Sequence, residues 1–350
     1  MLDRRFFLAS AAGAAAFLPA VASAAGLDSI NPDIRFGTTG SIFGAWPNGA
    51  LKMSTNMEMM LADVKHYGLE GFEPYAAQIV PWLGKPEALR SLSERMGVTL
   101  MDVGDVPPAS GPAPARGAAP NYAWLGGKAR KELIGRMEAF ARDFLQPLGI
   151  DHWKNNMGPR PPGGPSDDQL KALADTANEI GQRTKKYGVR LSLHAHLWGP
   201  MEREPDFRKV MSLTDPNYVW LILDTGHNVL GGMNPVKIAD EFFPRISEFH
   251  LKDTYPQFRN NKQTPTPAEH AKKSVYASVG QGGGVDFPGI FRVIRQRHFK
   301  GWAVFDIDAP RPGDGTGSVD DNLTASVRYM RDVLHVRLPS VSGPGLYKDA

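Results

Sequence analysis

Short apolar runs alternate along the chain with longer stretches in which apolar residues recur every three or four positions. The short runs are typical of buried strands, and the longer stretches are typical of amphipathic helices. Several helical stretches stop at a glycine, such as Gly68 and Gly97, and Ser166 stands where an N-cap is expected. The predicted strands cover residues 34–38, 69–73, 98–102 and 150–154 and four later runs that end at His194, Asp224, His250 and Asp306. The predicted helices cover residues 56–67, 86–96, 131–145, 166–187, 205–213, 235–242, 287–297 and 319–335.

Eight consecutive strand-helix units predict an α/β fold, a single (β/α)8 TIM barrel over residues 25–337. An open, doubly wound sheet is the alternative. The glycine-rich run at 280–284 does not favour that alternative, because no buried strand precedes it as a phosphate-binding or dinucleotide-binding loop requires. Two Pro/Gly-rich segments, 104–127 and 158–165, are expected to be loops over the strand ends rather than linkers between domains.

Polar residues end four consecutive predicted strands, the fifth to the eighth. They are His194, Asp224, His250 and Asp306. The carboxyl ends of barrel strands converge on one face, so we expect these side chains to meet. Two imidazoles and two carboxylates suit one divalent ion, Mn, Mg, Co or Zn. Asp308 is an alternative eighth ligand, because alternation along a strand places it on the same side as Asp306.

Three motifs carry a resemblance to a known family. Leu223-Asp224-Thr225-Gly226-His227 is followed by His250-Leu251-Lys252-Asp253 and later by VGQGGGVDF at residues 279–287. With the barrel pattern, these motifs resemble the xylose isomerase-like superfamily of sugar isomerases, epimerases and inosose dehydratases. The resemblance extends over residues 34–335. It implies that Asp224 and His250 bind metal, that His227 lies beside substrate oxygens, and that Lys252 lies close by.

The ends of the fifth and eighth strands differ from the pattern of the ketose epimerases. The resemblance implies that those enzymes usually carry Glu at both positions. This chain has His194 and Asp306 there. Proton exchange on both faces of a sugar carbon needs a base on each side, so the loss of one carboxylate argues against 3-epimerisation. The His-x-His of SLHAH, residues 192–196, is closer to inosose dehydratase-like members. We therefore favour a lyase or hydratase that acts through an enediolate. The alternatives are a sugar isomerase or epimerase of the same superfamily and a non-catalytic metal- or sugar-binding barrel.

Further strand-end residues are assigned roles within this chemistry. Three of these residues also have a purely structural alternative. Glu73 could fix the turn before Pro74, His196 could brace His194, and the Trp198 ring could serve only loop packing. Lys252 could form a local ion pair with Asp253. The expected catalytic residues are Glu73, His196, His227 and Lys252, and the expected substrate-binding residues are Lys154, Trp198 and His227.

The N-terminal residues 1–24 resemble a twin-arginine export signal. Arg4 and Arg5 precede an apolar stretch at 11–22, and Ala22-Ser23-Ala24 offers a cleavage site. The stretch is short for a bilayer span, so we expect it to be removed, with an uncleaved anchor as the alternative. This predicts a periplasmic protein without membrane contact after removal of the signal. The absence of cysteine agrees with an oxidising compartment.

The composition of the chain limits the classes of molecule that it is expected to bind. The chain has 350 residues, is 42% hydrophobic and carries a net charge of +3, without a basic and aromatic pattern typical of nucleic-acid binding. Export favours a small, unphosphorylated carbohydrate as substrate. The polar segment 254–279 is expected to be a lid over the site or the subunit contact of a homo-oligomer. Residues 338–350 are expected to form a loose tail.

Overall fold

The computed structural model describes residues 33–47, 51–105, 122–313 and 315–347. The expected export signal lies outside these residues, as does most of the loop expected at 104–127. Within the described ranges, none of the helices combines the length and the apolar character needed to cross a membrane.

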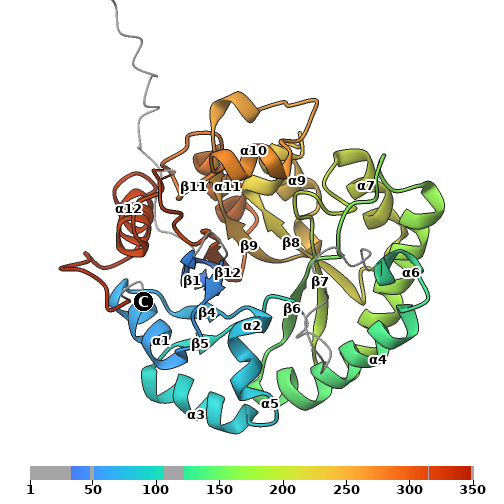
Figure 1. Cartoon of the computed structure of the whole chain (residues 1–350), viewed down its shortest axis with the longest axis horizontal. Coiled ribbons are helices and arrows are strands. Elements are labelled where there is room, and N and C mark those ends of the chain that lie inside the picture. The colour runs from blue at the N-terminus through green and yellow to red at the C-terminus, as the bar shows by residue number, and fades with distance from the viewer. Residues whose placement is uncertain (1–32, 48–50, 106–121, 314, 348–350) are drawn as a thin grey trace, which may run out of the picture.

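Eight parallel strands form one curled sheet in the order β5-β4-β1-β12-β9-β8-β7-β6. The strands occupy the centre of the molecule and helices surround them (Figure 1). This confirms the predicted TIM barrel. The barrel strands are β1 (Ile34–Thr39), β4 (Gly71–Glu73), β5 (Thr99–Leu100), β6 (His152–Asn155), β7 (Arg190–His194), β8 (Val219–Asp224), β9 (Ile246–Leu251) and β12 (Gly301–Phe305).

The seam between β5 and β6 is closed by side-chain and loop contacts. The Asp102 carboxylate accepts hydrogen bonds from the Lys154 backbone N–H at 2.8 and 3.0 Å. The backbone N–H of Asp105 donates to the carbonyl of Lys154 at 3.1 Å. A buried carboxylate therefore takes the place of ladder bonds beside the very short strand β5.

Helix ends follow the local sequence. Ser166 caps α6 in a capping box with Gln169, as its position predicted, and Asn56 caps α1. Gly97 ends α3 with φ +66°, which glycine adopts at little cost. The main helices are α1 (Met57–His66), α3 (Pro86–Met96), α4 (Arg130–Phe140), α6 (Asp167–Thr184), α7 (Glu204–Leu213), α9 (Pro235–Glu241), α11 (Phe287–Gln296) and α12 (Val319–Asp332).

Shorter elements decorate the carboxyl ends of the strands. An antiparallel hairpin follows β1, and a second antiparallel pair holds the base of the 254–279 segment. That segment also contains a short helix, so it is a structured segment at the carboxyl face of the barrel. The elements are β2 (Gly44–Ala45) with β3 (Lys52–Met53), β10 (Asp253–Thr254) with β11 (Tyr276–Ala277), α8 (Thr225–Leu230) and α10 (Pro267–Lys272).

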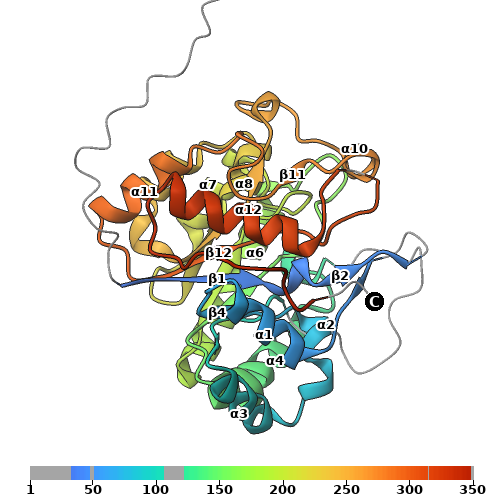
Figure 2. The same ribbon diagram turned by 90° about the vertical axis from the view of Figure 1, so that its left-hand side faces the viewer.

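The C-terminal segment packs on the barrel. Helix α12 lies beside α11 (Figure 2), and the rings of Phe287 and Tyr329 meet with centroids 5.9 Å apart. Beyond α12, the N–H of Gly345 donates to Asp320 at 3.0 Å, and the ring of Tyr347 packs on Phe43 at 5.3 Å. The part of the expected tail that the structure describes is therefore bonded to the body of the protein.

Candidate metal and catalytic site

The four strand-end residues expected to bind metal lie together at the carboxyl face of the barrel. His194 and Asp224 are the last residues of β7 and β8, His250 lies in β9, and Asp306 follows β12. Their strands are neighbours in the sheet, and Asp224 is paired with His250 in the strand register. All four side chains are buried. Strand order thus brings residues more than a hundred positions apart into one cluster.

His194 presents an unprotonated nitrogen to the cluster. Its Nδ1 lies 2.8 Å from Oδ1 of Asn156, whose own amide nitrogen donates to Asp105 at 2.8 Å. Because the amide oxygen can only accept, Nδ1 of His194 carries the proton and Nε2 carries a lone pair. Burial, aided by the charge of Lys154, lowers the pKa of His194 well below its usual value, so the ring is neutral.

Asp224 directs one carboxylate oxygen to the backbone and the other to His194. Its Oδ1 caps α8 by accepting the N–H of His227 at 2.7 Å. Its Oδ2 lies 3.6 Å from Nε2 of His194, and neither atom has a hydrogen-bond partner among the described residues. Burial, and next the charge of Asp306, raises the pKa of Asp224 to about 7. A lone pair and a carboxylate oxygen thus face each other with no donor between them.

These atoms fit a divalent cation. One ligand atom from each of His194, Asp224, His227 and Asp306 lies within 4.8 Å of the others. Three of those residues hold a buried polar atom without a hydrogen-bond partner in the described chain: Nε2 of His194, Oδ2 of Asp224 and Nε2 of His227. Imidazole nitrogens and carboxylate oxygens are the ligands of zinc and related metals.

His250 lies at the border of this group. Its Nδ1 is 3.1 Å from Asp306 and 4.0 Å from Asp224, whereas its Nε2 is 2.8 Å from both Glu73 and Glu248. Burial opposes protonation of the ring, but the charge of Glu73 and the hydrogen bonds to Asp306 and Glu248 together outweigh it and raise the pKa of His250 well above its usual value. His250 therefore joins the expected metal cluster to a second buried cluster formed with Glu73 and Glu248.

Two buried lysines flank the cluster. Nζ of Lys154 lies 2.6 Å from Glu73, and Nζ of Lys252 lies 2.8 Å from Asp308 and 3.5 Å from Asp306. Burial opposes their charge, yet the neighbouring carboxylates outweigh it and raise the pKa of both lysines. Both side chains are therefore fixed cations at the floor of the site. The alternative for Lys252, an ion pair with Asp253, is not formed, because Asp253 accepts backbone N–H groups from residues 282, 283 and 285.

Two further histidines have opposite hydrogen-bonding roles. His196 donates from Nδ1 to the carbonyl of Leu197 at 2.6 Å, and burial lowers its pKa to about 4, which leaves Nε2 as a free acceptor. His227 instead accepts at Nδ1 from the N–H of Leu197 at 3.3 Å, and the Tyr276 hydroxyl lies 3.4 Å away. Its Nε2 therefore carries the proton. The two rings lie 4.0 Å apart, so one acceptor and one donor stand side by side.

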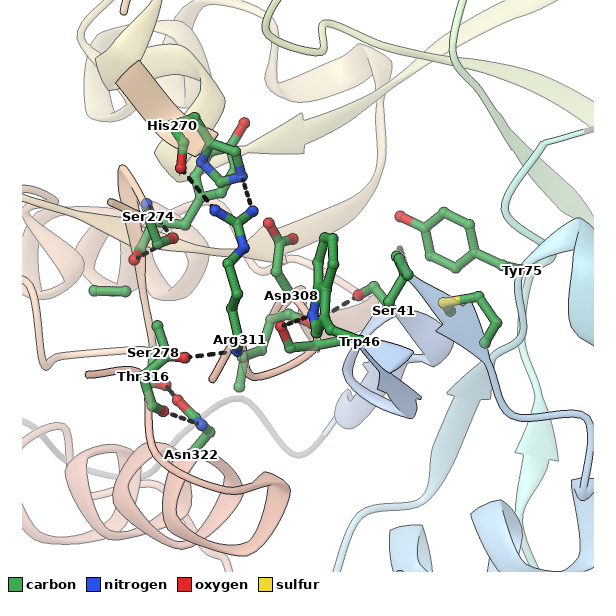
Figure 3. Close-up of a pocket in the computed structure, with 16 residues that line it drawn as sticks. Ser41, Trp46, Tyr75, His270, Ser274, Ser278, Asp308, Arg311, Thr316 and Asn322 are labelled. Carbon is green, nitrogen blue, oxygen red and sulfur yellow. Dashed lines mark hydrogen bonds between the residues drawn. The ribbon is translucent and has the colours of Figure 1, made fainter. Parts of the chain in front are cut away.

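A cavity of about 360 Å³ opens beside this cluster (Figure 3). Ser41, Tyr75, Tyr276 and Asp308 line it and connect it to the buried groups. Ser41 donates to Asp306 at 3.2 Å, the Tyr75 hydroxyl lies 3.3 Å from Nζ of Lys154, and Asp308 pairs with Lys252. A ligand in this cavity therefore reaches both lysines through groups that contact them directly.

Trp198 lies to one side of this cavity. Its φ is +63°, and its indole N–H donates to the carbonyl of Pro265 at 2.8 Å. Its ring packs near His270 at 5.5 Å. The indole thus anchors the 254–279 segment, and Trp198 is not among the residues that line the 360 Å³ cavity.

Sequence reasoning missed several residues of the site. Glu248 could have been predicted, since it precedes His250 by two positions and its side chain therefore lies on the same side of the strand. Asn156 stands just beyond β6, where its amide side chain resembled an ordinary loop residue. Tyr75 and Tyr276 carried no signal, because aromatic residues near strand ends usually serve packing.

The family described as xylose isomerase-like TIM barrel matches residues 61–333 of this chain. Among curated proteins, inosose dehydratase of Clostridium botulinum (strain Alaska E43 / Type E3) is 29% identical over 150 residues, which cover 41% of this chain and 48% of that protein. The chain thus spans about half the length of the curated relatives it matches.

Solved structures share the fold. A sugar phosphate isomerase/epimerase from Parabacteroides distasonis superposes with a TM-score of 0.58 at 16% identity, covering 87% of this chain and 96% of that one. The IOLI protein, solved with a binding zinc atom, superposes with a TM-score of 0.58 at 16% identity, covering 86% of this chain and 98% of that one.

Proposed function

Because the chain belongs to the xylose isomerase-like TIM barrel family, we propose that it is a divalent-metal-dependent enzyme that removes the proton beside the carbonyl of a sugar or cyclitol and then eliminates a β-oxygen. The observation that carries this proposal is the 3.6 Å approach of the His194 lone pair to Asp224 Oδ2 in a buried site without a donor between them. Two buried acceptor atoms that face each other have lost their hydrogen bonds to water and gain none from each other, and a divalent cation bound by both atoms would offset that loss.

The metal would be held by His194, Asp224 and Asp306, with His250 at the border of the group. His227 would instead donate from its protonated Nε2 to a substrate oxygen, because its Nδ1 accepts the N–H of Leu197. When bound, a divalent cation polarises a carbonyl and neutralises the charge that develops on its oxygen. The zinc atom of the IOLI protein supports a metal in this fold.

The chain's own residues provide the acid-base chemistry. We assign His196 as the base, because its unprotonated Nε2 is held by the Nδ1 hydrogen bond to Leu197. The fixed cations Lys154 and Lys252 favour negative charge on the enediolate oxygens. The electron pair of the broken C–H bond first forms the C=C bond of the enediolate. When the carbonyl re-forms, that pair makes the C=C bond between the α- and β-carbons as the bond to the β-oxygen breaks. The protonated His196 returns its proton to this oxygen, which departs as water.

Elimination is favoured over epimerisation by the state of Glu73. A second base on the opposite face of the sugar is required for epimerisation. Glu73 is tied to Lys154 at 2.6 Å and to His250 at 2.8 Å, so it is not a free base. The similarity to inosose dehydratase supports the same choice, whereas the fold shared with a sugar phosphate isomerase/epimerase supports isomerisation as the second candidate. We further propose that the enzyme works in the periplasm, after export by its twin-arginine signal.

The test is proton exchange in deuterated water. Metal-loaded protein incubated with scyllo-inosose or an unphosphorylated keto sugar should exchange the proton next to the carbonyl, followed by NMR, and chelation should abolish the exchange. His196→Ala should slow exchange by about 10²-fold or more, while the exposed His298→Ala serves as the matched control. Full activity in chelator would contradict the metal requirement. Exchange without loss of oxygen would identify an isomerase or epimerase, and metal binding without exchange would identify a non-catalytic barrel.

A further inference from the structure

The 360 Å³ cavity has two chemically different parts. Its inner part is polar and contacts the proposed catalytic groups through Ser41, Tyr75, Tyr276 and Asp308. Its outer part has an apolar wall, and Trp46 belongs to this wall (Figure 3). The residues of the apolar wall are Trp46, Leu51, Met53, Ile307 and Ala309. Enolisation of a sugar or cyclitol uses only the inner part.

The apolar wall is built by the hairpin that follows β1. Trp46 comes directly after β2, and Leu51 comes directly before β3. The Trp46 indole N–H donates to the carbonyl of Ala309 at 3.3 Å, which joins the hairpin to the segment after β12. Leu51 is 45% exposed although it lies in the cavity wall. A free sugar, covered with hydroxyls, leaves this exposed apolar surface in water.

The cavity offers no free cation for a phosphate among its described lining residues. Among the described lining residues, Arg311 is the one with a lysine or arginine side chain, and both of its terminal nitrogens are engaged by neighbouring protein groups. Its Nη1 donates to the carbonyls of His270 and Ala271 at 2.8 and 3.3 Å, its Nη2 lies 3.0 Å from Nε2 of His270, and its guanidinium lies 4.7 Å from the Trp46 ring. The carboxylate of Asp308 lines the same space and repels anions.

We infer that the outer part is a subsite for an apolar, aromatic aglycone, so that the substrate is an uncharged keto-glycoside whose sugar ring, which carries the keto group, occupies the inner part. Pockets for drug-sized ligands start at about 300 Å³, so the cavity has room for a sugar joined to a second ring. Aromatic rings favour stacking on tryptophan, and apolar area removed from water stabilises the complex. The assignment of the sugar end rests on the proposed function.

Binding measurements on the metal-loaded protein test this subsite independently of turnover. Isothermal titration should show phenyl β-D-glucoside binding at least about tenfold more tightly than methyl β-D-glucoside, with glucose 6-phosphate weaker than both. Equal affinity for the phenyl and methyl glucosides, tighter binding of glucose 6-phosphate, or no measurable binding of the phenyl glucoside would overturn the inference.

Variants locate the preference in the hairpin wall. Trp46→Ala and Leu51→Ser should bring the affinity ratio of phenyl to methyl glucoside close to one. Leu213→Ser is the matched control, since Leu213 is also exposed, at 40%, and lies on α7 away from the cavity. An unchanged ratio in both cavity variants would place the aglycone elsewhere and overturn the subsite. Failure of proton exchange with a retained phenyl preference would instead reject only the proposed reaction.

Discussion

The amide oxygen of Asn156 lies 2.8 Å from Nδ1 of His194 and thereby decides which ring nitrogen of the histidine is free. Asp105 fixes the orientation of that amide by accepting its N–H₂ group at 2.8 Å. The lone pair of His194 is therefore directed at Asp224 by a residue that lies 38 positions away in the sequence. Partners of this kind commonly set the ligand strength of a histidine.

Asn156→Ala is expected to lower metal affinity about 10- to 100-fold, because His194 loses the acceptor that holds its tautomer. Titration with zinc or manganese against a competing chelator measures the change. Asn217→Ala, at an exposed position, should leave affinity unchanged. Equal affinities in wild type and Asn156→Ala would show that this hydrogen bond does not prepare the site.

Asp224→Asn is expected to abolish stabilisation by metal. In wild type, a metal at about 1,000 times its Kd should add roughly 4 kcal/mol to the free energy of unfolding. The amide cannot supply the anionic oxygen, so the variant should show little or no rise in Tm when metal is added. A rise in Tm as large as that of wild type would exclude Asp224 from the ligand set.

Lys154→Met is expected to lower the free energy of unfolding by up to about 3–5 kcal/mol, because the buried carboxylate of Glu73 loses one of its two cationic partners and keeps only His250. Glu73→Gln added to this variant should recover part of the loss, and urea denaturation measures both. Lys171→Met is the matched control: its pair with Asp175 is exposed, so its effect should stay under about 1 kcal/mol. Additive effects of the two site substitutions would argue against direct coupling.

The stability of the protein should decrease with rising pH through the titration of His152. Burial opposes its charge, but hydrogen bonds to Asp151 and Glu248 outweigh it and raise the pKa of His152 from 6.5 to about 10. A raised pKa means that the protonated ring stabilises the fold fully below pH 6.5 and that this contribution is lost as pH rises through about 10.

Urea denaturation at intervals from pH 6 to 10 measures this contribution. His152→Gln should remove on the order of a few kcal/mol at pH 6, and the difference from wild type should narrow toward pH 10. A difference that stays constant over this range would show that His152 is neutral in the folded protein.

The parts predictable from sequence were local. The helix α3 (Pro86–Met96) begins and ends where expected, because a proline starts it and Gly97 stops it. The strands ending at His194 and Asp224 were found because an apolar run stops at a polar residue. Their meeting at one face followed from the barrel alone, since parallel strands present their carboxyl ends together. The catalytic and metal-binding roles of these residues remain predictions.

The sequence by itself thus determined the order of the elements, the barrel and the polar strand ends, because each depends on periodicity and on residues adjacent in the chain. Only the tertiary structure decided the pairing of His194 with Asn156, the capture of Glu73 by Lys154 and the place of Trp46 in the cavity wall. Those contacts join residues from different strands and loops. They depend on side-chain rotamers and on which strands are neighbours, and local sequence patterns predict neither.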